Sequence, residues 1–148
     1  DGVDLGHWRH NAGGIDLNRD WAYYRQPEVK QVANHLVKEC IRNKSELVLG
    51  LDFHSTYNDV YYTPDHTIRS TLEGFKDYWL MGIENALPDY EAHDSPGPAT
   101  SPTSKNWFYR QFEAEGITFE IGDNTPREFI QAKGRAAAIE MMELLIFR

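Results

Sequence analysis

A glycine-containing turn near the start of the chain carries side chains suited to gripping a carboxylate. Arg9, Asn18 and Arg19 flank this turn within the stretch 9–20. A planar guanidinium donates paired hydrogen bonds to a carboxylate and stabilises an oxyanion better than an ammonium does. Two aspartates occur in the same stretch, so an alternative is a turn held by its own ion pairs. The stretch therefore indicates either a carboxylate site or a self-paired turn.

Two further ionisable residues lie in strand-like apolar surroundings. His54 follows the apolar run 47–53, and Glu120 lies inside the run 117–121. A neutral imidazole is the commonest protein ligand for zinc, and burial raises the pKa of a carboxyl group, as a general base needs. The plainer alternatives are a hydrogen-bonded histidine at a loop start and a solvent-facing edge-strand glutamate. Arginine, histidine and glutamate in this order indicate a metal-dependent hydrolase acting beside a carboxylate.

Three separate motifs resemble those of the zinc metallocarboxypeptidases, the family that includes pancreatic carboxypeptidase A. They are Trp8-Arg9 with the stretch 16–21, then His54-Ser55, then the stretch 118–120, in the family's order and at similar separations. Trp107 also falls where the family usually has a tryptophan. The resemblance implies hydrolysis of the C-terminal peptide bond by glutamate-assisted attack of a zinc-bound water. The implied substrate is a peptide with a free C-terminal carboxylate.

The resemblance also implies a role for each matching residue. Glu120 would be the general base, and Arg9 would polarise the scissile carbonyl group. His54 would be a zinc ligand, and Asp16 would orient a metal-ligating histidine from the second coordination shell. The implied substrate-binding residues are Asn18, Arg19, Ser55 and Lys105.

Lys105 falls at the pocket position that sets side-chain preference in the family, counting back from Glu120 without a gap. A cation there predicts a preference for an acidic C-terminal residue; the alternative is a solvated lysine at a helix start. The segment 92–104 is rich in proline, serine and threonine, which predicts a mobile connection or lid. No tyrosine occurs between Tyr90 and Tyr109, so the family's substrate-contacting tyrosine is either Tyr90 or absent.

The chain departs from the family in one respect, because no histidine is followed three residues later by glutamate. The family takes two further zinc ligands from such a His-x-x-Glu motif, upstream of the first arginine. Asp1-Gly2 also resembles the second half of a turn that normally lies inside the domain. We therefore expect residues 1–148 to form a single domain that is the C-terminal part of a longer catalytic domain. One zinc ligand would lie here and two upstream, the missing N-terminal part would be a partner, and this chain alone would be inactive.

Composition narrows the class of protein. The 148 residues are 41% hydrophobic, which suffices for one core, and carry a formal charge of −8 with a pI near 5.2. This acidity argues against a nucleic-acid partner. No apolar run is long enough to cross a bilayer, so we expect a soluble protein of unknown compartment. Cys40 excludes an intrachain disulfide and is expected to be a buried thiol on a helix.

Hydrophobic spacing predicts alternating helices and strands. Helices are expected over 27–43, 68–86, 107–112 and 129–147, and strands over 47–53, 59–63 and 117–121. Thr125 and Glu128 are expected to form a capping box for the last helix. The alternation predicts an α/β three-layer sandwich with a mixed, mostly parallel sheet, as in part of a carboxypeptidase-like (phosphorylase/hydrolase-like) fold. His54 and Glu120 would lie at strand ends, where sites of such sheets gather.

Two other functions stay open. One is a zinc amidohydrolase of the aspartoacylase or desuccinylase type, which resembles the chain in Asp-Leu-Asn-Arg and in a strand-end histidine, and whose substrate would be an acyl-amino acid. The separate Trp8-Arg9 motif and the setting of Glu120 favour the carboxypeptidase. The other is a non-catalytic remnant that binds peptide C-termini through Arg19.

Overall fold

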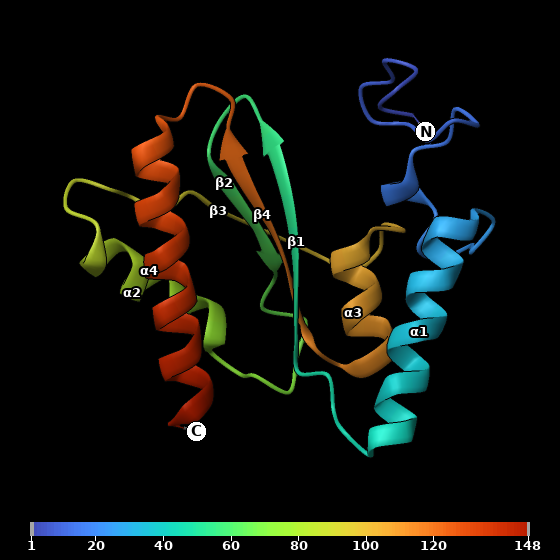
Figure 1. Cartoon of the computed structure of the whole chain (residues 1–148). Coiled ribbons are helices and arrows are strands. Elements are labelled where there is room, and N and C mark those ends of the chain that lie inside the picture. Colours follow the sequence, from blue (N-terminus) through green and yellow to red (C-terminus); the bar gives the residue numbers. More distant parts are fainter. Residues whose placement is uncertain (1, 148) are drawn as a thin grey trace.

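A computed structural model describes residues 2–147, in which helices and strands alternate as predicted (Figure 1). The strands are β1 (Leu49–Thr56), β2 (Val60–Pro64), β3 (Asp94–Gly97) and β4 (Glu115–Gly122). The helices are η1 (Leu17–Arg19, a 3-10 turn), α1 (Pro27–Asn43), α2 (Phe75–Ala86), α3 (Ser104–Phe112) and α4 (Arg127–Ile146).

The strands form one mixed sheet in the order β1-β4-β2-β3. β1 pairs with β4 in parallel, β2 pairs with β3 in parallel, and β2 runs antiparallel to β4. Helices α2 and α4 lie on one face of the sheet, and α1 and α3 lie on the other (Figure 1). The α/β sandwich with a mostly parallel sheet, predicted from the sequence, is therefore confirmed.

The main hydrophobic core fills the space between the sheet and the helices α2 and α4. Its largest member, Trp79 of α2, is fully buried and packs edge-on against Tyr61 and Phe119. The Trp79 indole N–H donates to the carbonyl oxygen of Ala137 on α4 at 2.8 Å. Truncating such a residue to alanine costs about 3–5 kcal/mol. This core therefore fixes β4, the strand that carries Glu120.

Glycines let α3 lie directly on the opposite face of the sheet. A methyl group on Gly50 of β1 would lie 2.1 Å from the ring of Phe108, and one on Gly116 of β4 would lie 2.0 Å from the carbonyl oxygen of Lys105. Real side chains do not approach so closely, because interiors are already close-packed. The two glycines thus bring the start of α3, at Ser104, down onto β1.

Several predicted boundaries are wrong for identifiable reasons. β1 continues to Thr56, so His54 lies within the strand rather than at its end. The helix predicted from Ile68 begins only at Phe75, after a turn in which Gly74 adopts a positive φ. The turns before α2 also contain buried apolar residues, such as Leu72, and their spacing resembles that of a helix. The segment 92–104 contains β3, which tolerates a proline because it is an edge strand.

Two local predictions on helices are also wrong. The capping box is not formed: α4 has no side-chain cap, and the backbone N–H of Thr125 instead donates to the carbonyl oxygen of Gly122 at 3.0 Å. Cys40 is half-buried rather than buried. Within residues 2–147, other elements pack against only part of the apolar stripe of α1. Ile41, on that stripe, is 73% exposed.

Strand β1 is the outer strand of the sheet on the side of the candidate site. Within residues 2–147 it pairs only with β4. Its Phe53 is 67% exposed. No helix within the same residues combines the length and apolarity needed to traverse a lipid bilayer.

Candidate active site

Two adjoining cavities lie where β1 and β4 approach the turn 9–20. The first, of about 610 Å³, contains Arg9, Asp16, Asn18, His54, Ser55 and Glu120 in its lining. The second, of about 560 Å³, shares four of these and adds Arg19 and Lys105. Every site residue predicted from the sequence therefore lines one cavity or the other.

His54 and Glu120 are neighbours across two strands. They are register partners in the parallel pair β1–β4, and each is followed by two more residues of its strand. Neighbouring strands lie about 4.8 Å apart, and register partners face the same side of the sheet. Residues far apart in the sequence, a histidine and a carboxylate, thus face one cavity.

Glu120 is held in the setting that a general base requires. Burial raises the pKa of its carboxyl group, an effect that His54 opposes. Its Oε2 atom is buried and has no hydrogen-bond partner among the described residues. Because burying an unsatisfied carboxylate oxygen is costly, this atom is the best-placed acceptor for a group bound in the cavity.

Asp52, which the sequence analysis did not single out, links His54 to the turn. Its Oδ2 lies 2.9 Å from His54 Nε2 and accepts a hydrogen bond from Asn18 Nδ2 at 3.1 Å. The hydroxyl of Ser104, at the start of α3, donates to the same oxygen. The hydrogen bond to Asp52 is the largest cause of a raised pKa of His54. The signal available in the sequence was the period-two spacing of Asp52 and His54 on one strand face.

The turn itself is built by side chains that bond its backbone. The Asn11 side-chain oxygen accepts from the N–H groups of Gly13 and Ile15, each at 3.0 Å. Asp16 caps η1 by accepting from the N–H of Asn18 at 3.0 Å, and its other oxygen pairs with Arg9 at 2.9 Å. The alternative of a turn held by its own ion pairs therefore holds for Arg9, because part of its guanidinium group is bound to Asp16.

Arg19 is not paired with either aspartate of the turn. Its guanidinium donates to the carbonyl oxygen of Asn18 at 2.9 Å and is otherwise open to the second cavity. Asp20 instead accepts from the backbone N–H groups of Arg25 and Gln26, which orders the start of α1. Arg19 therefore keeps donors available for a carboxylate.

Lys105 lines the second cavity, but its ammonium group is not free. It donates to the backbone carbonyl of Thr63 at 2.9 Å. Burial lowers the pKa of Lys105, and the carboxylates of Asp65, Asp94 and Glu115 oppose that effect. These three carboxylates thus partly balance the positive charge of Lys105.

Tyr90 does not lie where a substrate-contacting tyrosine would have to lie. The Tyr90 hydroxyl donates to Asp59 at 2.9 Å, and its ring packs against Phe129 on the core side of the sheet. It lines neither cavity of the site. Tyr62 of β2 does line the second cavity and is 40% exposed. Its place follows from register with Thr118, which no local pattern reveals.

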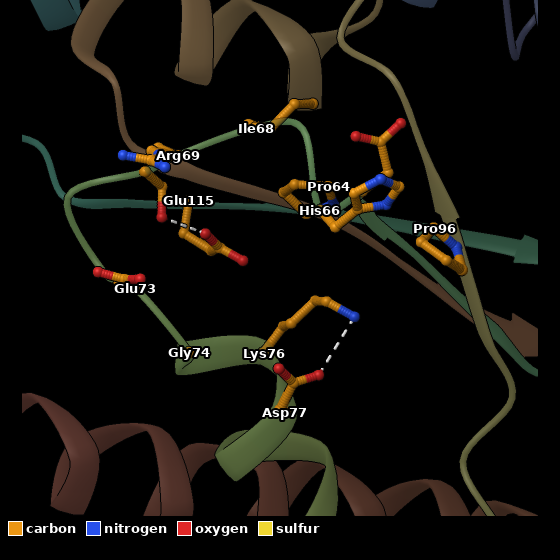
Figure 2. Close-up of a pocket in the computed structure, with 12 residues that line it drawn as sticks. Pro64, His66, Ile68, Arg69, Glu73, Gly74, Lys76, Asp77, Pro96 and Glu115 are labelled. Carbon is orange, nitrogen blue, oxygen red and sulfur yellow. Dashed lines mark hydrogen bonds and ion pairs between the residues drawn. The ribbon is translucent and has the colours of Figure 1, made fainter.

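A third cavity, of about 490 Å³, contains none of the predicted site residues (Figure 2). Its Lys76 ammonium is already paired with carboxylates. Lys76 lies 2.8 Å from Asp94 and 3.2 Å from Asp77, and Ser70 donates to the buried Glu115. Because its lysine is already paired, this cavity offers a weaker case for ligand chemistry than the first two.

The described residues fit a zinc site only in part. Residues 2–147 contain no group of three or more histidine, cysteine or acidic side chains able to hold a metal ion. Both polar contacts of the His54 ring use Nε2, which leaves Nδ1 to act as a ligand. Together with the unsatisfied Glu120 oxygen, this provides one ligand and an adjacent base.

Comparisons with known proteins place the fold. No family model matches the sequence. An uncharacterised protein of Zymomonas mobilis is 29% identical over 82% of this chain and 34% of its own length. A metallo-carboxypeptidase structure from Burkholderia cenocepacia has a TM-score of 0.75 at 19% identity, covering 99% of this chain and 42% of that one.

A metallo-carboxypeptidase from Pseudomonas aeruginosa, solved with (2-guanidinoethylmercapto)succinic acid, has a TM-score of 0.61 at 20% identity. That match covers 99% of this chain and 43% of the other. The chain therefore has the α/β fold found in metallocarboxypeptidases. It spans about a third of the curated relative and about two fifths of these solved structures.

Proposed function

We propose that this chain is part of a zinc-dependent metallocarboxypeptidase that removes the C-terminal residue of peptides. The observation that carries the proposal is that His54 and Glu120 are register partners across β1 and β4, with Asn18 and the available donors of Arg19 beside them. The fold shared with metallo-carboxypeptidase structures supports the same reaction class. The requirement for a free carboxylate follows from the cationic side of the cavity.

The proposed reaction assigns one task to each group. Glu120 takes a proton from the attacking water as the new C–O bond forms, and returns it to the amine nitrogen as the C–N bond breaks. Arg9 stabilises the oxygen on which negative charge develops. Asn18 and Arg19 hold the terminal carboxylate, and Ser55 is part of the lining of the first cavity.

His54 is the residue of this chain proposed to hold zinc. Bound zinc supplies Lewis-acid polarisation and lowers the pKa of water. The remaining two ligands are proposed to come from a segment outside these residues, which would also be the chain's structural partner. Asp16, bonded to Arg9 and Asn18, is the proposed second-shell residue of the turn.

The test is peptide hydrolysis by the full-length gene product. It should cleave an N-blocked peptide with a free C-terminal carboxylate and leave the C-terminal amide intact. Glu120→Gln should reduce kcat about 10²- to 10⁴-fold, whereas the exposed control Glu128→Gln should be unaffected. Full activity of a folded Glu120→Gln enzyme would refute the proposal.

The same assay separates the other two functions. Cleavage of an N-acyl amino acid in preference to a peptide would indicate the amidohydrolase, which no comparison favours. Peptide binding without hydrolysis by a zinc-loaded protein would indicate the non-catalytic remnant.

Lys105 is proposed to set the preference for the C-terminal side chain. Because Asp65, Asp94 and Glu115 partly balance its charge, the preference for glutamate should be modest. Equal rates on glutamate-ended and phenylalanine-ended peptides would count against this role.

A further inference from the structure

A single carboxylate oxygen joins the two halves of the candidate site. Asp52 Oδ2 lies 2.9 Å from His54 Nε2 and 3.1 Å from Asn18 Nδ2, and it accepts the Ser104 hydroxyl. The Asp52 side chain is only 19% exposed, so water competes weakly for these positions. His54 belongs to the proposed metal position and Asn18 to the proposed carboxylate position. Asp52, which also lines the first cavity, therefore contacts both.

Ser104 decides which way the Asn18 amide points. The backbone N–H of Ser104 donates to the Asn18 side-chain oxygen at 2.8 Å. An amide oxygen can only accept, so the NH₂ group must be the end that faces Asp52. The orientation of Asn18 is thus fixed from α3 and does not depend on a bound substrate.

The contact between Asp52 and His54 determines which ring nitrogen carries the proton. An ionised carboxylate only accepts hydrogen bonds, so the 2.9 Å contact is attractive only when Nε2 bears hydrogen. A lone pair on Nε2 would instead face the carboxylate oxygen. In the neutral ring, the proton on Nε2 leaves Nδ1 with its lone pair exposed for coordination.

Asn18 favours the opposite tautomer. Its Nδ2 lies 3.2 Å from His54 Nε2, and with the proton on Nδ1 the ring would accept an amide hydrogen from Asn18. The ring would then lose its free Nδ1 lone pair, and Asn18 would lose a donor. With the proton on Nε2, one amide hydrogen binds Asp52 and the other is not taken up by His54.

We propose that Asp52 is the positioning residue of the site, selecting the His54 tautomer that frees Nδ1 and, through the same oxygen, holding the Asn18 amide with one donor unused. Its functional meaning rests on the proposed carboxypeptidase activity. The selection itself is a property of this chain's own residues and requires neither metal nor substrate. A hydrogen bond to a charged acceptor should favour the Nε2–H form about tenfold or more.

The tautomer can be measured on the metal-free full-length gene product. Nitrogen-15 NMR of histidine-labelled protein distinguishes protonated from unprotonated ring nitrogens. His54 is assigned by loss of its signals in His54→Gln, at a pH where its ring is neutral. We expect wild-type Nε2 to be protonated in at least about nine-tenths of molecules, the population of a tenfold preference. A majority Nδ1–H form in the wild type would overturn the proposal, whatever the variants do.

Variants then identify Asp52 as the cause. Asp52→Leu removes the acceptor and leaves Asn18 as the partner of Nε2, so the Nδ1–H form should become the major one. The side-chain amide signals of Asn18 should shift with it. Asp94→Leu is a matched control, because that carboxylate is similarly exposed, at 26%, but binds Lys76. It should leave the His54 tautomer unchanged.

Ser104→Ala provides a second variant with a milder perturbation. It keeps the backbone N–H that fixes Asn18 and removes only the hydroxyl donor to Asp52. The Nε2–H form should persist in this variant. An unchanged tautomer in folded Asp52→Leu would overturn the positioning role. Absence of peptidase activity with an intact tautomer preference would instead count against the proposed function alone.

Discussion

The buried ion pair between α4 and the start of β2 offers a sharp test of the packing behind the site. Lys133 of α4 is fully buried, whereas its partner Asp59 retains 22% side-chain exposure. The ammonium lies 4.4 Å from the ring centroid of Phe119 and 4.6 Å from that of Tyr61. We predict that Asp59→Asn is much more destabilising than Lys133→Met.

The asymmetry follows from what each charge keeps when its partner is removed. Removing one partner of a buried pair costs about 3–5 kcal/mol, because a charge remains buried without compensation. Asp59→Asn leaves Lys133 in that state, although each aromatic ring returns about 0.5–2 kcal/mol. We expect a loss of about 3 kcal/mol. Lys133→Met leaves Asp59 with a buried Oδ2, but Oδ1 keeps the hydrogen bond from the Tyr90 hydroxyl and the side chain is 22% exposed. Because this variant also replaces a charged group by an apolar one, its loss should be clearly the smaller of the two.

Urea unfolding of the two variants measures both values. Burial lowers the pKa of Lys133 below its ordinary 10.5, and Asp59 opposes this shift. Between the folded pKa and 10.5 the unfolded chain binds more protons, so stability rises with pH in that window. Asp59→Asn should lower the folded pKa of Lys133 further, so the pH window begins at a lower pH. The variant should therefore regain stability as the pH rises.

Two results would refute this reasoning. One is a Lys133→Met variant as unstable as Asp59→Asn. The other is an Asp59→Asn variant whose deficit does not shrink with rising pH. The double variant should match Lys133→Met, because it contains no buried charge.

Three further predictions concern the site and its support. Because burial raises the pKa of Glu120 above its ordinary 4.5 in the absence of metal, NMR titration of this carboxyl group in the metal-free protein should give a pKa above 4.5; a value at or below 4.5 would contradict this. Arg19→Gln should raise KM for a free-carboxylate peptide about 10- to 100-fold, the value of a charged hydrogen bond, and leave kcat nearly unchanged in steady-state kinetics. Gly116→Ala should cost about 1–3 kcal/mol by overpacking against Lys105, whereas Gly134→Ala, which meets no atom within 4 Å, should raise Tm slightly.

The sequence predicted those helices and strands that are determined by residues close together in the chain. α1 begins at Pro27 and ends at Asn43 as expected, since proline suits the first turn and Lys44 adopts the left-handed conformation that ends a helix. β4 was found from its β-branched and aromatic content. The motif residues His54 and Glu120 then fell into one cavity because the sheet aligns them.

What local patterns missed depends on contacts between distant parts of the chain. Ser104 and Asp52 are separated by 52 positions, and their hydrogen bond follows from the close seating of α3 on Gly50. β3 contains proline and glycine and becomes a strand only by pairing with β2. Neither arrangement leaves a periodic trace in the sequence.

Within residues 2–147, the outer edge of β1 is unpaired and lies beside the candidate site, so association of two molecules at this edge would affect access to the site. An exposed strand edge pairs with any strand that presents matching N–H and C=O groups, including the same edge of another molecule. Such pairing would set a second β1 about 4.8 Å from the first, shielding Phe53 and lying alongside His54. In a sample that contains only these residues, we therefore expect the share of molecules with an open cavity to fall as the concentration rises.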